Sequence, residues 1–202
     1  VPEPYGSVLI LAPWNYPFML ALDVLAGAVA AGNCAVISPS EYAPVTAQLI
    51  RKIISDVFPE NYIAVADGGV ECNQELLRLP FDYIFFTGSP RVGQIVMKAA
   101  AEHMTPVTLE LGGKSPCIVD ETACLPVAAR RLAFGKCLNA GQTCVAPDYL
   151  LIQESVKEEF LTLLKKEITS MYGQDILINP DYPRIITRDH YNRILRLIRE
   201  SC

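Results

Sequence analysis

The sequence lacks the features that mark several large classes of protein. Its 202 residues include only 17 lysines and arginines against 22 aspartates and glutamates, so the formal net charge is −5. Without a basic stripe the chain has little to neutralise phosphates, and nucleic acid is not an expected partner.

The most apolar stretch covers only residues 18–31 and contains Asp23. It is shorter than the roughly 20 residues that cross a bilayer, so no membrane span is expected.

Paired cysteines are lacking too. The seven cysteines are Cys34, Cys72, Cys117, Cys124, Cys137, Cys144 and Cys202. Their number is odd, and no two of them form a C-x-x-C pair. This spacing fits neither a disulfide framework nor a zinc site, so no metal is expected. Reduced thiols are usual in the cytosol, and the sequence therefore predicts a cytoplasmic protein.

The chain is rich in short apolar runs that alternate with stretches of helical periodicity, and 51% of its residues are hydrophobic. Continuous apolar runs are typical of strands buried on both faces. Strands are expected at 6–12, 34–37, 61–66, 82–86, 106–111, 115–119 and 149–152, and helices at 18–31, 44–58, 70–79, 90–102, 125–138, 155–171 and 188–199. Alternation of this kind predicts parallel βαβ units. The expected fold is α/β: an open parallel Rossmann-like sheet with helices on both faces, then the start of a second α/β domain. The boundary is expected at the glycine pair at 112–113.

One cysteine has a distinctive setting. Residues 140–149 read Ala-Gly-Gln-Thr-Cys-Val-Ala-Pro-Asp-Tyr, a short glycine-bearing loop that leads into an apolar run. A cysteine in a loop between a helix and a strand can be reached by a substrate, as a thiolate nucleophile must be. The alternative is that Cys144 is a small buried hydrophobe, as most cysteines are.

Histidine is scarce, and neither His103 nor His190 can be assigned as a partner of Cys144. His103 ends a predicted helix beside Glu102, and His190 lies among charged residues of the last helix. A hydrolase of the papain type, which needs a Cys–His pair, is therefore a weaker alternative.

Two polar residues stand where predicted strands end, which in an open parallel sheet is the ligand-binding edge. Asn15 lies in a turn between two prolines, where its amide could donate to a developing oxyanion or merely satisfy the turn backbone. Glu110 is flanked by leucines beside a glycine pair. Partial desolvation there would raise its pKa towards that of a general base, although a strand-end glutamate usually faces solvent.

A third feature of this edge is the loop Thr87-Gly88-Ser89 ahead of Pro90. Ser89 is a plausible N-cap, and Pro90 suits the first helical position. The amide groups at this helix start favour a phosphate. However, Gly88 and Gly93 do not complete a G-x-G-x-x-G pattern, so a plain helix cap is the alternative.

In their order along the chain, these segments resemble the aldehyde dehydrogenase superfamily, in particular its class 3-like branch. The matching phrases are Ala-Pro-Trp-Asn-Tyr-Pro at 12–17, Pro-Ser-Glu at 39–41, Phe-Thr-Gly-Ser at 86–89 with Val-Gly at 92–93, Leu-Glu-Leu-Gly-Gly-Lys-Ser-Pro at 109–116, and Gly-Gln-Thr-Cys at 141–144. The likeness extends over essentially the whole chain, and the ordered set is far more specific than any one phrase.

The resemblance implies oxidation of an aldehyde to a carboxylic acid, with NAD or NADP accepting the hydride. Cys144 would be the nucleophile and form a thiohemiacetal and then a thioester. The side chain of Asn15 and the backbone N–H of Cys144 would hold the oxyanion, and Glu110 would activate the hydrolytic water. The cofactor-binding residues implied are Trp14, Ser38, Glu41, Gly88, Ser89, Gly93 and Leu111.

Two departures from the family qualify this expectation. Ser38 stands where relatives usually carry a lysine that holds the adenosine ribose, which leaves the choice between NAD and NADP open. The chain also lacks segments that family members carry at both ends. We therefore expect a central fragment, with most of the cofactor domain at 1–110, the first part of the catalytic domain at 111–202, and a homodimer for the full-length protein. A catalytically inactive nucleotide-binding fragment and a cofactor-independent cysteine acyltransferase or hydrolase remain alternatives.

Overall fold

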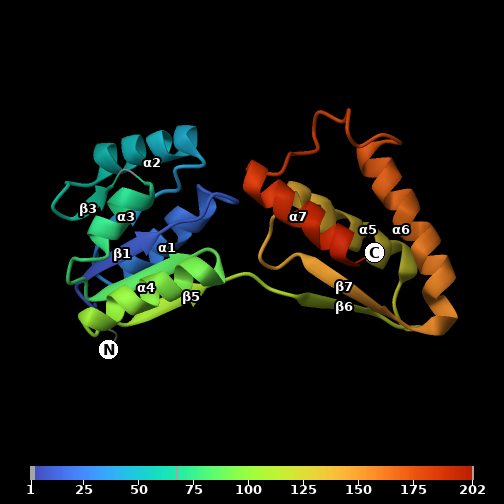
Figure 1. Ribbon diagram of the computed structural model, residues 1–202, viewed down its shortest axis with the longest axis horizontal. Helices are drawn as coiled ribbons and strands as arrows, with labels where there is room; N and C mark the ends of the chain where they lie inside the picture. The colour runs from blue at the N-terminus through green and yellow to red at the C-terminus, as the bar shows by residue number, and fades with distance from the viewer. Residues whose placement is uncertain (1–2, 67, 202) are drawn as a thin grey trace. The chain divides into compact units, whose positions relative to one another are not determined.

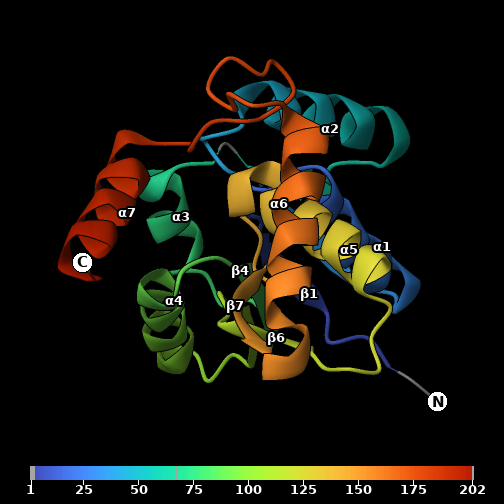
Figure 2. The same ribbon diagram turned by 90° about the vertical axis from the view of Figure 1, so that its right-hand side faces the viewer.

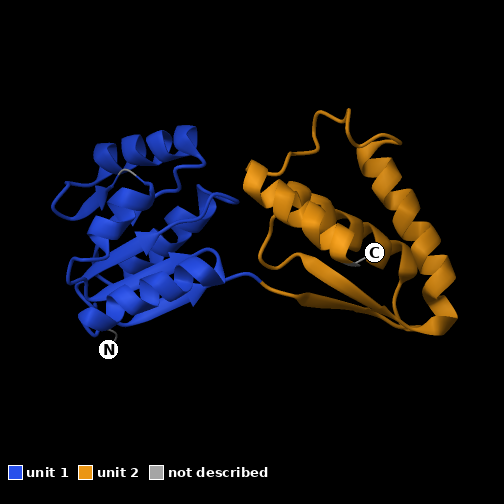
Figure 3. Ribbon diagram, in the orientation of Figure 1, with its two compact units in different colours: residues 1–112 blue, residues 113–202 orange. Residues whose placement is uncertain are grey.

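The computed structural model describes residues 3–66 and 68–201, and the chain divides into two compact units (Figures 1 and 3). Unit 1 is Val1–Gly112 and unit 2 is Gly113–Cys202. The division falls inside the glycine pair at 112–113, two residues after Glu110. Each unit has a hydrophobic core of its own.

Unit 1 alternates strands and helices from end to end. Its elements are β1 (Ser7–Leu11), α1 (Met19–Ala30), β2 (Cys34–Ser38), α2 (Pro44–Val57), β3 (Ile63–Val65), α3 (Val70–Leu76), β4 (Tyr83–Thr87), α4 (Pro90–Glu102) and β5 (Val107–Glu110). The five strands form one sheet in the order β3-β2-β1-β4-β5, and every pair is parallel. All five carboxyl ends therefore lie along the same edge of the sheet.

The two faces of this sheet are covered by different helices. Alternate residues of β1 point to opposite faces because successive side chains in a strand alternate. Val8 and Ile10 pack with α1 and α2, whereas Leu9 and Leu11 pack with Phe86 of β4 and Val96 of α4. Figure 2 shows α1 on one side of the strands and α3 and α4 on the other. Burial on both faces explains why these strands are continuous apolar runs.

Unit 2 contains a smaller sheet. Its elements are β6 (Ser115–Val119), α5 (Leu125–Cys137), a 3-10 helix η1 (Leu138–Gly141), β7 (Pro147–Ile152), a second 3-10 turn η2 (Glu154–Val156), α6 (Lys157–Tyr172) and α7 (Arg188–Ser201). Strands β6 and β7 pair in parallel with an irregularity at Ser115 and Pro116. The core of the unit includes Ala129 of α5 and Phe160 of α6, both fully buried.

The predicted α/β fold, with its parallel sheet and helices on both faces, is confirmed. The limits of α4 and β6 match the expectation, and most other ends shift by one or two residues. Helix α3 ends at Leu76 rather than residue 79, and β7 begins at Pro147 rather than residue 149. The two 3-10 turns have no hydrophobic periodicity and were not expected. No helix in the described part of the chain is both long and apolar enough to cross a membrane.

Candidate active site

The sheet of unit 1 gathers the predicted site residues of that unit along its carboxyl edge. The chain leaves β1 towards β2 and β3, and returns to the other side of β1 with β4 and β5. The order of the strands thus reverses between β1 and β4, and ligands of open α/β sheets bind in the crevice at such a point. The turn with Asn15 follows β1, and the loop with Gly88 and Ser89 follows β4.

Asn15 is partly buried within the turn after β1, next to the equally half-buried Trp14. Its side-chain oxygen accepts a hydrogen bond from the Tyr16 N–H, 3.1 Å away. The turn is thereby fixed through the oxygen, whereas an oxyanion would need the amide nitrogen as its donor. The bond therefore orients the side chain and is compatible with both roles expected for it.

At the end of β2, Ser38 and Glu41 differ sharply in their surroundings. Ser38 is only 2% exposed, and its hydroxyl donates to Asn73 Oδ1 of α3 at 2.6 Å. A serine held in this way ties α3 to the end of β2. Glu41 is exposed on the following turn. Of the two predicted cofactor contacts at this position, Glu41 is therefore the one whose side chain is open to a ligand.

The start of α4 is a capped helix. Ser89 Oγ accepts from the Val92 N–H at 3.3 Å, as expected for an N-cap, and the Gly88 N–H donates to the carbonyl of Glu110 at 2.9 Å. Gly93 is buried where α4 meets the sheet, and a Cβ there would lie 3.0 Å from Leu111 Cδ2. A larger residue at this position would require the Leu111 side chain to shift.

Glu110 is the last residue of β5, and its side chain is exposed. Of the two alternatives weighed for Glu110, the structure shows the one that faces solvent. Alternate residues of a strand point to opposite sides, so Leu109 and Leu111 turn towards the core next to α4. An exposed carboxylate at a strand end is, however, accessible to water.

Cys144 belongs to unit 2, in the loop between η1 and β7. Its side chain is half-buried, and the following Val145 is 74% exposed. Cys144 is the second residue of a turn over residues 143–146, in which the Ala146 N–H donates to the carbonyl of Thr143 at 3.2 Å. The thiol is therefore neither sealed in the core nor part of a regular element, as a nucleophile requires.

The backbone of Cys144 lies against the first residue of the unit. A Cβ on Gly113 would be 2.8 Å from the carbonyl oxygen of Cys144, closer than real Cβ atoms approach. The neighbouring Gly112 has nothing within 4 Å of the same position. Only Gly113 of the pair is therefore required by close packing, and it fixes where the cysteine loop lies.

Two other cysteines of unit 2 lie at the ends of helix α5. Cys137, at the end of α5, is half-buried, and burial raises the pKa of its thiol. A raised pKa lowers the thiolate fraction at neutral pH. Cys124 is exposed at the N-cap of α5, beside the buried Leu125. The ring of His103 contacts the carbonyl of Arg78 at 3.0 Å, and both residues belong to unit 1.

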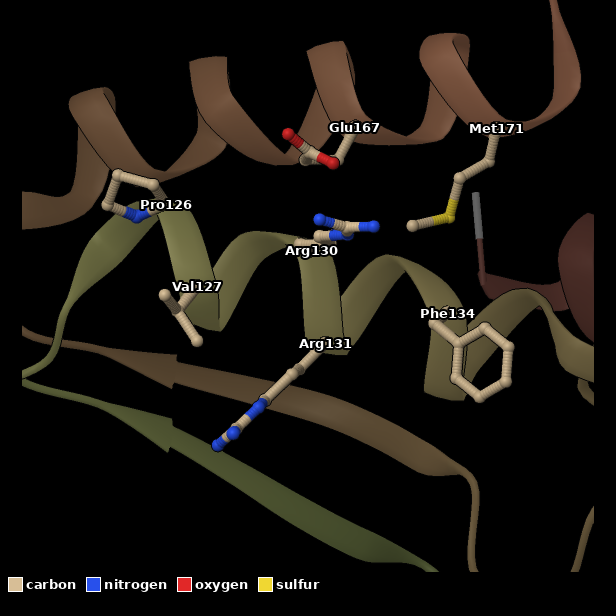
Figure 4. A pocket seen from close by; sticks show the side chains of 7 residues that line it. All are labelled: Pro126, Val127, Arg130, Arg131, Phe134, Glu167 and Met171. Atoms are coloured by element: carbon tan, nitrogen blue, oxygen red, sulfur yellow. The ribbon is translucent and has the colours of Figure 1, made fainter.

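Two surface hollows lie in unit 2. The larger, about 610 Å³, runs between α5 and α6 and contains none of the predicted site residues (Figure 4). Its lining consists of Pro126, Val127, Arg130, Arg131, Phe134, Glu167 and Met171. The smaller, about 440 Å³, is formed mainly by residues 176–191 and includes Ala140 of the loop that leads to Cys144.

Sequence reasoning missed three residues that shape this site. Asn73 anchors Ser38, Gly113 packs on Cys144, and Gln142 bonds to residues 184 and 186. Gly113 and Gln142 lie in phrases that the sequence analysis singled out, but their contacts were not predicted, and Asn73 left no signal. Asn73 binds Ser38, 35 positions away, and Gln142 binds residues 184 and 186, more than 40 positions away, which no local pattern reveals.

These features define a class: an α/β protein with polar loops at the carboxyl edge of a parallel sheet in one unit and a half-buried loop cysteine in the other. The model of the aldehyde dehydrogenase family matches residues 1–202. The chain belongs to that family.

Named relatives agree with this assignment. The chain is 56% identical to 4,4'-diaponeurosporen-aldehyde dehydrogenase of Staphylococcus aureus and 50% identical to a mouse aldehyde dehydrogenase described as dimeric and NADP-preferring. These matches cover 98% and 97% of this chain, and 43% of each relative. The chain thus spans less than half the length of the curated relatives it matches.

Solved structures give the same result. A substrate-bound Staphylococcus aureus AldH superposes with a TM-score of 0.89 at 56% identity, covering 98% of this chain and 43% of that one. A Mycobacterium tuberculosis aldehyde dehydrogenase complexed with NAD+ has a TM-score of 0.84 at 33% identity, with 95% and 40% covered.

Proposed function

We propose that this chain is the central part of an enzyme that oxidises an aldehyde to a carboxylic acid with NAD or NADP. Unit 1 is most of the cofactor domain, and unit 2 is the first part of the catalytic domain. The observation that carries the proposal is the accessible loop cysteine, Cys144, in a chain whose family is named for aldehyde oxidation.

The carboxyl edge of unit 1 fits a dinucleotide. The strand order reverses between β1 and β4, which is where nucleotides bind in such sheets. The buried Gly93 lets α4 pack against the end of β5, so its N-terminus lies at the same edge. Trp14, Glu41 and Ser89 follow strands at this edge and would hold the cofactor. When bound, NAD or NADP supplies the acceptor for the aldehyde hydride.

The residues of the chain perform the remaining steps. The Cys144 thiolate attacks the aldehyde carbon and forms a C–S bond, and the carbonyl electron pair moves to oxygen as a thiohemiacetal oxyanion. The Asn15 amide and the Cys144 N–H donate hydrogen bonds to this oxyanion. Loss of hydride leaves a thioester on Cys144. Glu110 takes a proton from water, the hydroxide oxygen bonds to the acyl carbon, and the thiolate departs with the C–S electron pair.

The decisive experiment replaces Cys144 with alanine in the full-length protein. We expect reduction of NAD(P) by a medium-chain or aromatic aldehyde to be abolished, because the covalent route has no other nucleophile. Cys124→Ala, which removes an exposed cysteine of the same unit, serves as the control and should retain activity. Undiminished turnover by the Cys144→Ala protein would refute the proposal.

A second candidate is a nucleotide-binding protein without catalysis. It is favoured by one observation, the neutral and buried Ser38 where relatives usually have lysine. Titration with NAD, followed by the fluorescence of Trp14, separates the two. Binding without turnover supports the second candidate, and turnover refutes it.

Ester hydrolysis that persists undiminished without cofactor would instead favour a cysteine hydrolase. For the full-length enzyme we further propose a cytoplasmic homodimer.

A further inference from the structure

The backbone just before Cys144 has an unusual conformation. Asn139, Ala140 and Gly141 have φ angles of 52°, 53° and 76°, so three consecutive residues are left-handed. In the described part of the chain, Met104 is the one other residue besides glycine with positive φ. Left-handed backbone is unfavourable for residues with a Cβ, and it persists only where the surroundings hold it in place.

The side chain that holds this turn is Gln142. Its amide nitrogen donates to the carbonyl of Asn139 at 3.0 Å, and the Gln142 backbone N–H donates to the same oxygen at 3.0 Å. In the other direction, the Asn139 amide donates to the Gln142 carbonyl at 3.4 Å. Together these bonds close the left-handed turn on itself.

The same carboxamide also reaches a segment more than forty positions further along the chain. Its nitrogen donates to the carbonyl of Arg184 at 3.2 Å, and its oxygen accepts from the Ile186 N–H at 2.9 Å. A donor and an acceptor used together in this way mimic the peptide group of a neighbouring strand. The segment is itself anchored, because Arg184 Nη2 donates to the carbonyl of Leu177 at 2.6 Å.

The turn and Cys144 are joined through Thr143 alone, and the carbonyl of Cys144 rests on Gly113. The nucleophile loop is thus held before the cysteine by Gln142 and at the cysteine by Gly113. We propose that Gln142 is a positioning residue, whose carboxamide bridge to residues 184 and 186 sets the place and reactivity of the Cys144 thiol. This inference rests on the proposed function, in which Cys144 is the nucleophile.

The test is Gln142→Met in the full-length enzyme, since methionine keeps the volume and removes the side-chain hydrogen bonds to residues 139, 184 and 186. A misplacement of about 1 Å can reduce a rate by about 10²-fold, so we expect kcat to fall by about that factor. The KM for NAD(P) should change by less than about threefold, because Gln142 lies outside the cofactor edge of unit 1. The alkylation rate of Cys144 by iodoacetamide should change by at least about fivefold.

Unit 2 offers a matched control in Gln153. Its carboxamide also bridges a distant segment, with the nitrogen donating to Glu121 Oε2 at 2.9 Å and the oxygen accepting from the Glu121 N–H at 3.0 Å. Gln153→Met therefore removes a similar bridge that does not involve the cysteine loop. We expect it to leave kcat and the alkylation rate unchanged.

If kcat and alkylation in Gln142→Met stay within about twofold of the unsubstituted enzyme, the positioning role is overturned. It is also overturned if Gln153→Met lowers both to the same extent. The proposed function is tested separately by Cys144→Ala, whose inactivity leaves it standing in either case. If Gln142→Met fails to fold, Gln142→Asn, which keeps the amide but shortens its reach, should show the same alkylation change in a folded protein.

Discussion

The two units place their chemical groups by different means. In unit 1, Asn15, Ser89 and Glu110 stand directly after or at the end of strands in a sheet buried on both faces. In unit 2, Cys144 lies on a loop with left-handed backbone, supported by hydrogen bonds and one glycine contact. The positions of the site residues in unit 1 therefore follow from the regular fold, whereas the position of Cys144 in unit 2 depends on a few specific contacts.

The sheets of the two units also differ in how deeply their strands are buried. In unit 1 the central strand β1 is almost wholly buried, whereas in unit 2 one face of the sheet leaves Ile118 72% and Leu151 52% exposed. We conclude that substitutions in unit 1 should affect chemistry with little effect on folding, and that those around the cysteine loop should affect both.

The largest effect in unit 1 should come from Glu110→Gln in the full-length enzyme. Loss of a general base lowers kcat by about 10²–10⁴-fold. Since the carboxylate acts only in thioester hydrolysis in the proposed mechanism, a burst of reduced nicotinamide in the first turnover should remain, as stopped-flow absorbance would show. Glu102→Gln, at the end of α4, is the control and should keep full activity. A Glu110→Gln enzyme with unchanged kcat would remove Glu110 from the mechanism.

Asn15→Ala should have the next largest effect. Loss of one oxyanion donor costs about 10²–10³-fold in rate. Because the oxyanion forms when Cys144 attacks, the burst itself should slow, unlike the burst of Glu110→Gln. Asn61→Ala, an exposed asparagine of the same unit, should change nothing. If the burst of Asn15→Ala keeps its normal rate, the role of Asn15 is confined to the turn through Tyr16.

The glycine pair tests the support of the cysteine loop. A methyl group on Gly113 would collide with the Cys144 carbonyl at 2.8 Å, whereas one on Gly112 meets nothing within 4 Å. Overpacking typically costs about 1–3 kcal/mol. Gly113→Ala should therefore lower the free energy of unfolding by that amount and alter alkylation of Cys144. Gly112→Ala should stay within about 1 kcal/mol. Denaturant unfolding measures both, and equal values would contradict the assigned contact.

The smallest expected effect is on how the free energy of unfolding depends on pH, through Asp82 of unit 1. Hydrogen bonds from the Ser7 N–H at 2.7 Å and the Ser7 hydroxyl at 2.9 Å lower the pKa of Asp82. A lowered pKa in the folded state stabilises the protein above the unfolded-state pKa, and this contribution is lost as pH falls through the folded-state value. Asp82→Asn should be slightly less stable at neutral pH, and the difference should vanish in acid. A difference that grows on acidification, measured by denaturant unfolding, would contradict this.

The sequence predicted the fold of unit 1 well because its determinants are local. Apolar runs such as 7–11 identify buried strands, and Ser89 with Pro90 identifies the start of α4. Parallel strands then place Asn15, Gly88 and Glu110 at one edge without further information. The sequence left the exposure of Glu110 open, and the structure shows the side chain exposed, because flanking leucines do not shield a side chain that points the other way.

The details around Cys144 could not be predicted in this way. The loop was recognised from its glycine and cysteine, but the left-handed turn at Asn139 and Ala140 depends on Gln142 and on residues 184 and 186. Likewise, the burial of Ser38 depends on Asn73 of α3. Such contacts join residues far apart in the chain and leave no period or spacing in the sequence.

The central claim is that Cys144 carries the acyl group during aldehyde oxidation. The most direct measurement is peptide mass spectrometry of full-length Glu110→Gln enzyme, quenched after mixing with aldehyde and NAD(P). The account predicts that the peptide containing Cys144 gains the mass of the acyl group, and that the gain requires both reactants. Turnover with Cys144 unmodified, or with the acyl group on another cysteine, would contradict it.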